Sequence, residues 1–320
     1  MPEPYPVLMP VRVRGAGATH TGPRREHNED AFAFFDDATA AIAIVADGMC
    51  GGRSGYEAAK RTIDACASIF RGRSATVLDD LAETWWLGEH GAGSPGARVR
   101  PFSTLPIAER VELRDHVRRL LERRVPEAMG DVAVLEAEKE SLLGIPRRTL
   151  ERANADIHRL IEKERGRWDG LAAASACVLF GAGRASIAHA GDCRVCRVRA
   201  GSIEALTREH TLRNEYETMP AEQRPDLTDE ELALLPGNVL TRALGLRDQV
   251  EVETTSVPVE TGDLFLVATD GFWRAFSEME LLTTLRARRT EAASYLVDRG
   301  KRDRPDHPGD NLTAVVVEIL

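Results

Sequence analysis

The stretch AAIAIVADGMCGG, residues 40–52, joins an apolar run to a single carboxylate that is followed by glycines. The run from Ala40 to Ala46 is rich in Ile, Val and Ala, which is typical of a β-strand. A strand end holds the Asp47 carboxylate rigidly at the rim of a sheet, and Gly48 lets a ligand approach the backbone closely. One such acid is most often only a turn residue, so its meaning depends on what the chain places beside it.

Three more acids stand beside a glycine at the boundary of an apolar run. They are Asp192 in IAHAGDCR, Asp270 in LFLVATDGFW and Asp310 in HPGDNLTAVVV. Carboxylates that converge on one rim repel each other unless they are protonated or neutralised by cations. An oxygen-only set without Cys or His selects hard ions such as Mg²⁺ or Mn²⁺ rather than zinc. Two such ions about 4 Å apart can share a water, lower its pKa and orient it for in-line attack on phosphorus.

The stretch RREHNEDAFAFF, residues 24–35, supplies a basic residue and two further acids ahead of another apolar run. An arginine beside a metal centre can grip a phosphate through paired N–H bonds, and Arg25 is predicted to do so. Glu29 and Asp30 are predicted to be acids on the metal side. The alternative is that the pair is only a solvated turn at the start of a strand.

Short strand-like runs divided by glycine turns follow one another with few regular helical spacers. They are VRVRGAG, DAFAFF, AAIAIVAD, ASACVLFGAG, RASIAHAGDCRVCRVRAG, VEVETTSV, DLFLVATDG and NLTAVVVEIL. Helical patterns interrupt them over about 56–70, 113–125, 150–161 and 277–299. This pattern favours an α+β fold in which a two-sheet antiparallel sandwich is flanked by helices. We expect a flexible, proline-rich arm over residues 1–10 and a single domain over 11–320.

Composition narrows the class of protein. The 320 residues are 43% hydrophobic and 29% charged, as in a soluble globular protein. A net charge of −9 disfavours a general nucleic-acid binder. The sequence has no apolar run long enough for a membrane span and no opening signal peptide, so we expect a cytoplasmic protein. Five scattered cysteines indicate a reducing compartment, and we interpret Cys193 and Cys196 as ordinary strand residues rather than a zinc or redox pair.

Seven ordered elements together resemble the metal-dependent protein phosphatases of type 2C (the PPM family), in the form of the bacterial serine/threonine phosphatases. The elements are R-x-x-N-E-D-A, V-A-D-G-M-x-G-G, G-D-x-R, L-T-R-E-H-T, N-V-L-T-R-A-L-G, T-D-G and G-D-N-L-T. The agreement runs from about Val11 to Leu320 with one long interruption. The resemblance implies a four-layer α-β-β-α sandwich of two antiparallel sheets, with a metal centre at one end of the sheets.

The resemblance also implies roles for the acids. Asp47 matches the Asp that bridges two metal ions and takes part in catalysis, and Gly48 matches the Gly whose carbonyl is a further ligand. Asp270 and Asp310 match ligands of the first ion. Glu29 matches a residue that contacts the second ion, often through water. Two or three Mn²⁺ or Mg²⁺ ions are therefore expected as cofactors.

Two further positions and one segment complete the implied site. Asp192 matches the ligand of a weaker third metal ion in bacterial members. Arg25 matches the phosphate-binding arginine, with a role in substrate binding and catalysis. Residues 210–245 resemble the mobile flap beside the cleft.

The function implied is hydrolysis of phosphoserine and phosphothreonine in proteins by direct attack of a metal-bridging hydroxide, without a covalent phospho-enzyme. The partners expected are phosphorylated proteins, the substrates of a serine/threonine kinase; no nucleic acid or membrane is expected, and the chain is expected to be a monomer. Two alternatives stay open. One is a catalytically weak regulator that binds phosphoproteins, and the other is a phosphatase dedicated to a single signalling or secretion-system partner.

The sequence departs from the family pattern at three positions and in one segment. Met49 stands where some members place a His proposed as general acid, and Cys193 replaces the usual Ser of G-D-S-R. Cys50 replaces a Gly; it is either an inert small residue or an oxidation-sensitive switch. Residues 71–143 form a helical insertion longer than the family usually carries. Its Trp85–Trp86 pair and its Arg-rich stripe (Arg114, Arg118, Arg119 and Arg123) either pack over a sheet face or dock a substrate.

Overall fold

The computed structural model describes residues 11–37, 40–49, 53–91, 142–168, 170–234, 236–302 and 309–320. The chain forms two compact units, one of Met1–Val7 with Ser68–Leu142 and one of Leu8–Ala67 with Leu143–Leu320. Helix α1 (Arg53–Gly91) begins in the larger unit and continues into the smaller one. The Arg-rich stripe and Cys50 lie outside the described residues, as do the surroundings of Trp85 and Trp86. That the insertion docks a substrate, and that Cys50 is either an inert residue or an oxidation-sensitive switch, stay predictions from the sequence.

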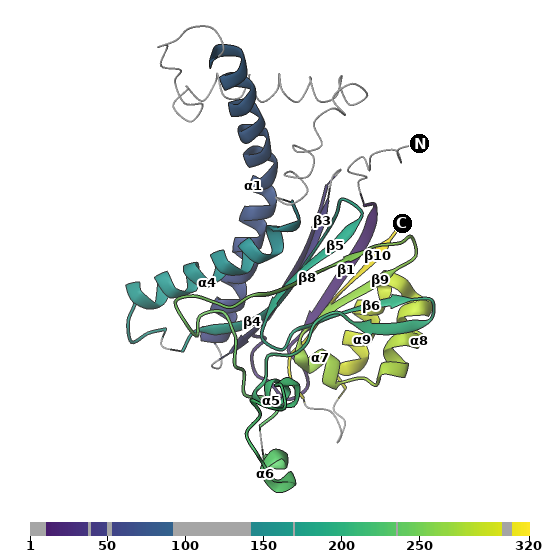
Figure 1. The fold of residues 1–320 in the computed structure, drawn as a ribbon. Coiled ribbons are helices and arrows are strands. Elements are labelled where there is room, and N and C mark those ends of the chain that lie inside the picture. The colour runs from purple at the N-terminus through teal and green to yellow at the C-terminus, as the bar shows by residue number, and fades with distance from the viewer. Residues whose placement is uncertain are drawn as a thin grey trace. The chain divides into compact units, whose positions relative to one another are not determined.

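The larger unit contains two five-stranded sheets in which every neighbouring pair of strands is antiparallel (Figure 1). The first sheet has the order β1 (Val13–His20), β10 (Leu312–Ile319), β9 (Leu264–Ala268), β6 (Arg194–Arg199) and β7 (Ser202–Ala205). The second has the order β2 (Asp30–Asp36), β3 (Ala41–Met49), β4 (Ala172–Gly181), β5 (Arg184–Ala190) and β8 (Glu253–Pro258).

The main core lies between the two sheets. Strand β3 contributes Ala41, Ala43 and Val45 to it, because alternate side chains of a strand point to the same face. Phe180 of β4 meets Phe265 of β9 across the interface, with ring centroids 5.0 Å apart and an interplanar angle of 71°. This edge-to-face contact helps to hold the two sheets against each other, and the strand ends at the rim are held with them.

Helices cover the outer faces of both sheets (Figure 1). Helix α4 (Ile145–Lys163) contacts β4 and β5, and it buries Leu150, Ala153 and Ile157 on one stripe. On the other side, α8 (Glu278–Arg288), the short η2 (Arg289–Glu291) and α9 (Ala292–Gly300) pack against the first sheet. The predicted helices at 150–161 and 277–299 are therefore confirmed, as is the α+β sandwich.

One strand prediction is corrected. The run RASIAHAGDCRVCRVRAG is not continuous, because β5 and β6 belong to different sheets. Between them Gly191 has a φ of +109°, a conformation that favours glycine, and a Cβ there would lie 2.4 Å from the Cβ of Ala174. The chain thus crosses from one sheet to the other at Gly191, and this crossing places Asp192 at the rim.

The buried cysteines behave as apolar side chains. Cys193 belongs to the core between the sheets, and Cys196 is buried in β6. Burial is the main cause that raises the pKa of both thiols, and it brings that of Cys196 to about 12. Both thiols are free and stay protonated at neutral pH, which disfavours the redox interpretation of C-x-x-C. No helix in the described part of the chain combines the length and apolar character needed to cross a membrane.

Candidate metal centre

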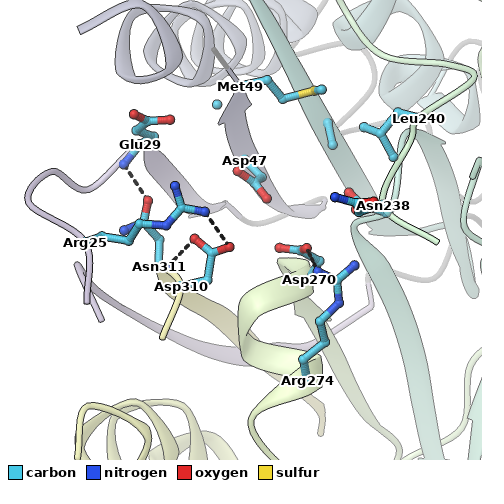
Figure 2. Close-up of a pocket in the computed structure, with 13 residues that line it drawn as sticks. Arg25, Glu29, Asp47, Met49, Asn238, Leu240, Asp270, Arg274, Asp310 and Asn311 are labelled. Atoms are coloured by element: carbon cyan, nitrogen blue, oxygen red, sulfur yellow. Dashed lines mark hydrogen bonds and ion pairs between the residues drawn. The ribbon is translucent and has the colours of Figure 1, made fainter. Parts of the chain in front are cut away.

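Acids from separate elements meet at one rim of the sandwich (Figure 2). Asp47 is near the end of β3, and Asp192 lies between β5 and β6. Asp270 is the first residue of α7 (Asp270–Arg274), which follows β9 closely, and Asp310 precedes β10. These four carboxylates and that of Glu29 line a single pocket, together with Arg25 and the backbone of Gly48. The structure therefore brings together every predicted site residue except Asp30.

The carboxylates disfavour each other's ionisation. The pKa of Asp47 is raised well above its ordinary value by burial and then by the charges of Asp30, Asp270 and Asp192. Burial also raises the pKa of Asp192 to about 7, with further increases from Asp270 and Glu209. Since cations in the pocket would favour the ionised forms of Asp47 and Asp192, the electrostatics fit a site for positive ions.

Asp30 occupies a different position from the one predicted. It is paired with Asp47 in the β2–β3 ladder but does not line the pocket. Its Oδ2 accepts a hydrogen bond of 2.8 Å from the Thr269 hydroxyl. Burial raises the pKa of Asp30 to about 7, although the hydroxyls of Thr313 and Thr269 lower it. Asp30 thus lies beside Asp47 on the neighbouring strand, where its charge raises the pKa of Asp47.

Two glycines, Gly48 and Gly55, allow oxygen donors to come close together near Asp47. A Cβ built on Gly55 would lie 2.5 Å from Glu29 Oε2 and 2.8 Å from the carbonyl oxygen of Gly48. A Cβ on Gly48 would lie 1.9 Å from the carbonyl oxygen of Gly55. Side chains at either position would displace these donors. The donors that meet here are a carboxylate and a backbone carbonyl, the oxygen ligands that Mg²⁺ and Mn²⁺ prefer.

Two arginines approach the acids from opposite sides of the pocket (Figure 2). Arg25 Nη2 donates to Asp310 Oδ2 over 2.8 Å, and Arg274 Nη1 pairs with Asp270 Oδ2 over 2.7 Å. The Arg25 side chain is 52% exposed, so its guanidinium stands at the open edge. Sequence reasoning missed Arg274, although its place four residues after Asp270 on a helix is a spacing typical of ion pairs.

Asn311 is a second residue that sequence reasoning missed. Its Oδ1 accepts from the backbone N–H of Glu29 over 2.8 Å (Figure 2). Its Nδ2 donates to the carbonyl oxygens of Thr21 and His27 over 2.7 and 3.0 Å. Asn311 therefore attaches the loop that carries Arg25 and Glu29 to the start of β10.

Replacing Asn311 with Ala is expected to lower the free energy of unfolding by roughly 3 kcal/mol, because three hydrogen bonds are lost. It should also weaken Mn²⁺ binding, since Glu29 loses its anchor. Urea denaturation and calorimetric titration with Mn²⁺ measure the two effects. Asn154→Ala is the matched control. It removes three similar hydrogen bonds, to Gly245, Arg247 and Asp248, outside the pocket. Unchanged Mn²⁺ affinity in Asn311→Ala would contradict the anchoring role.

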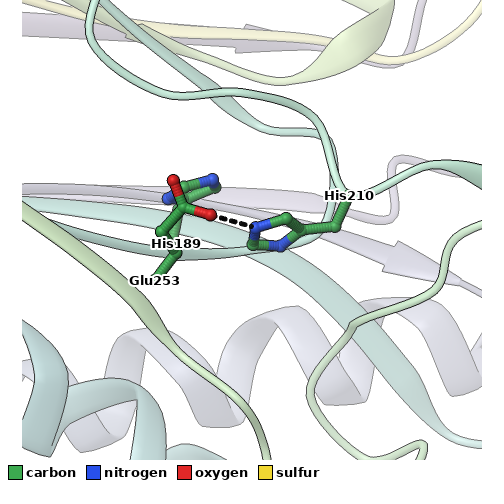
Figure 3. Close-up of side chains that lie close together, drawn as sticks. All are labelled: His189, His210 and Glu253. Carbon is green, nitrogen blue, oxygen red and sulfur yellow. Dashed lines mark hydrogen bonds and ion pairs between the residues drawn. The ribbon is translucent and has the colours of Figure 1, made fainter. Parts of the chain in front are cut away.

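A cluster of His189, His210 and Glu253 brings together side chains that can bind metals in other settings (Figure 3). The two imidazole rings are stacked, with centroids 4.4 Å apart and planes 17° apart. A metal ion lies near the plane of each imidazole that binds it, and two stacked, nearly parallel rings cannot meet this condition with one shared ion. The cluster is therefore not assigned as a metal site.

The same cluster ties the Asp192 loop to the predicted flap. His210 Nδ1 accepts from the Gly191 N–H over 3.2 Å, and Nε2 then donates to Glu253 Oε2 over 3.1 Å. His189 Nε2 donates to the Arg208 carbonyl over 2.9 Å. Burial lowers the pKa of His189 to about 4, so the ring is neutral at neutral pH.

The predicted flap, residues 210–245, contains two short helices, α5 (Leu212–Thr218) and α6 (Asp229–Leu234). An isolated bridge joins Thr211 to Leu240, so the two ends of the flap lie together. Asn238 and Leu240, near its second end, line the acidic pocket, as does Met49. The flap therefore forms part of the pocket wall.

Known proteins resemble this chain over nearly its whole length. The serine/threonine phosphatase stp of Listeria innocua is 24% identical over 303 residues, 94% of this chain and 93% of that protein. The S. agalactiae serine/threonine phosphatase structure has a TM-score of 0.62 at 22% identity, and covers 97% of this chain and 100% of that one. The PstP catalytic domain, solved in complex with two manganese ions, has a TM-score of 0.60 at 21% identity, over 96% and 98%.

These structural likenesses define the class: the two sheets and their helices have the fold of the PPM-type protein phosphatases. The family described as Protein phosphatase 2C matches residues 15–300. The chain belongs to that family. The resemblance found in the sequence is thereby confirmed, together with the enzyme class of protein serine/threonine phosphatase.

Proposed function

We propose that this chain hydrolyses phosphoserine and phosphothreonine in proteins, using Mn²⁺ or Mg²⁺ ions held by the acidic pocket. The observation that carries the proposal is the convergence of five carboxylates with an arginine at the open edge. Such a set of oxygen ligands is suited to hard divalent cations, and a guanidinium at its edge is suited to a phosphate. The phosphorylated proteins would be substrates of a serine/threonine kinase.

The residues divide between two proposed ion positions. Asp47, Asp270 and Asp310 would hold the first ion, while Asp47, the Gly48 carbonyl and Glu29 would hold the second. Bound divalent ions supply two effects, a water of lowered pKa and neutralisation of phosphate charge. Because phosphate monoesters hydrolyse very slowly without a catalyst, the barrier must fall by roughly 20 kcal/mol or more, and the carboxylates serve this by fixing the ions in place.

Arg25 is proposed to bind the phosphate. Its pKa is raised, chiefly by its hydrogen bond to Asp310, so it keeps its positive charge throughout the working pH range. The planar guanidinium can share N–H donors between Asp310 and two phosphate oxygens. Asp310 thus positions the arginine as well as contributing a carboxylate to the pocket.

Arg25→Ala is expected to raise KM for a phosphopeptide by about tenfold or more, with a much smaller change in kcat. The reason is that charge-assisted bonds to the phosphate, worth about 1.5–3 kcal/mol, are lost from substrate and transition state alike. Steady-state kinetics on one phosphoserine peptide measures both constants. Arg25→Lys, which keeps the charge without the planar fork, should fall between the wild type and Arg25→Ala. An unchanged KM in Arg25→Ala would remove Arg25 from the site.

The function is tested by assaying phosphoserine, phosphothreonine and phosphotyrosine peptides with Mn²⁺, with Mg²⁺ and with a chelator. Metal-dependent turnover of the first two peptides supports the proposal. A protein that binds these peptides with Mn²⁺ present but does not release phosphate would instead be the catalytically weak regulator. Turnover confined to one phosphoprotein, with all short peptides inert, would support a phosphatase dedicated to a single partner.

A further inference from the structure

Arg274 places a fixed positive charge among the acids of the pocket. It lies four residues after Asp270 on α7, and its Nη1 is 2.7 Å from Asp270 Oδ2. The close-up shows the guanidinium beside the Asp270 carboxylate, on the side of the pocket facing Asn238 (Figure 2). Arg274 and Asp192 line the same pocket. The family resemblance implies a third metal ion at Asp192.

Charged side chains of both signs lie near Asp192. Asp270, Glu209 and Asp47 are acids near it, and Arg274 is a nearby cation. Glu209 is already paired with Arg194, whose Nε donates to its Oε1 over 2.7 Å. Arg274 therefore supplies positive charge that offsets the negative charges of Asp192 and Asp270.

A third divalent ion does not fit this arrangement. Such an ion at Asp192 would need further oxygen ligands, and Asp270 is the acid of the same pocket whose charge acts most strongly on Asp192. One oxygen of Asp270 is paired with the Arg274 guanidinium, and the first proposed ion would take the other, so Asp270 has no oxygen left for a third ion.

We propose that Arg274 takes the place of a third metal ion, so that this chain binds two divalent ions and Asp192 acts as the counter-charge of Arg274 rather than as a metal ligand. This inference rests on the proposed two-ion function. Arg274 is then a positioning residue whose positive charge neutralises the acids near Asp192. The electrostatic effect of a third ion would then be built into the chain and independent of the metal concentration.

The test is calorimetric titration of the full chain with Mn²⁺, which counts ions without depending on activity. The wild type should bind two ions. Arg274→Met, which keeps the length of the side chain but removes its charge, should bind a third ion or bind its weakest ion at least tenfold more tightly. Arg274→Lys should behave as the wild type. In the double variant Arg274→Met with Asp192→Asn, the additional binding should disappear.

Asp192→Asn in the wild-type background gives a second measurement that does not depend on Arg274→Met folding. If Asp192 is not a ligand, this variant should still bind two ions with affinities within about threefold of the wild type. Three ions in the wild type, one of them lost in Asp192→Asn, would overturn the inference and leave the phosphatase proposal intact. Equal ion numbers and affinities in the wild type and Arg274→Met would also overturn it. A wild type that binds no Mn²⁺ would overturn both proposals.

Discussion

Asp270→Asn and Asp310→Asn are each expected to lower kcat at least about 1,000-fold while the protein stays folded. Each change keeps the shape of the side chain but removes an anionic oxygen from a site that binds hard cations. A 1,000-fold loss corresponds to about 4 kcal/mol of transition-state stabilisation, the scale of one well-placed electrostatic group. The fold should tolerate the change, because Asn keeps an oxygen that can accept the Asn311 N–H bond now made by Asp310.

The metal-free stability of these variants separates a metal role from a structural one. Each variant loses an ion pair, with Arg274 or with Arg25, but also relieves repulsion among the acids, so in chelator the variants should melt close to the wild-type temperature. Asp263→Asn is the matched control. Asp263 is buried and paired with Arg199 outside the pocket, so its change should lower stability and leave kcat unaltered. Near-normal rates in both pocket variants, or turnover that resists chelators, would exclude the two-ion mechanism.

Much of the pocket could be predicted because its acids stand where apolar runs begin or end. Asp47 and Asp270 each follow a buried strand segment, and Asp310 precedes one. In a sandwich whose strands are antiparallel, such positions gather at the rims of the sheets. Which rim each acid occupies depends on strand order, and local sequence does not encode strand order. The ordered motifs of the family supplied that information.

The roles of Glu29 and Asp30 show where local reasoning stops. Glu29 precedes β2, which begins at Asp30, so the alternation of a strand does not decide which of the two faces the pocket. The register of β2 against β3 pairs Asp30 with Asp47, but Asp30 accepts a hydrogen bond from the Thr269 hydroxyl and does not line the pocket, whereas Glu29 does. No residue pattern within N-E-D reveals that register, and the sequence therefore predicted both acids as ligands.

The supporting residues were missed because their partners are distant in the chain. Asn311 binds the backbone of Thr21, His27 and Glu29, which are more than 280 residues away. His189 and His210 meet only because the flap returns to the Asp192 loop. Arg274 is the exception, since its partner is one helical turn away. It went unnoticed because a five-residue helix after a D-G turn has too few residues to show a periodic pattern.

The metal-free protein is expected to lose stability as the pH rises from about 4 to about 7, and Mn²⁺ is expected to reverse this trend. Asp30 and Asp192 each have a pKa raised to about 7 in the folded state, against an ordinary value of 3.8. Within that window the unfolded chain has released both protons and the folded chain still holds them. The free energy of unfolding therefore falls with rising pH, by up to roughly 4 kcal/mol for each carboxyl group.

His189 changes the free energy of unfolding in the opposite direction as the pH rises, and it therefore reduces the net effect of the two carboxyl groups. Its pKa is lowered from 6.5 to about 4 in the folded state, so its contribution to stability rises with pH between these values, by up to roughly 3 kcal/mol. Two carboxyl groups outweigh one imidazole, so the chelator-treated protein should be less stable at pH 7.5 than at pH 5. Asp47 would hold both proposed ions, and burial and the neighbouring acids raise its pKa well above the ordinary value, so Mn²⁺ binding displaces a proton from Asp47 and the stabilisation by Mn²⁺ should grow as the pH rises. Urea denaturation at several pH values, with chelator and with Mn²⁺, measures both trends. In chelator, Asp192→Asn should lessen the loss of stability with rising pH. Equal stabilisation by Mn²⁺ at pH 5 and pH 7.5 would show that Mn²⁺ binding does not displace a proton from Asp47.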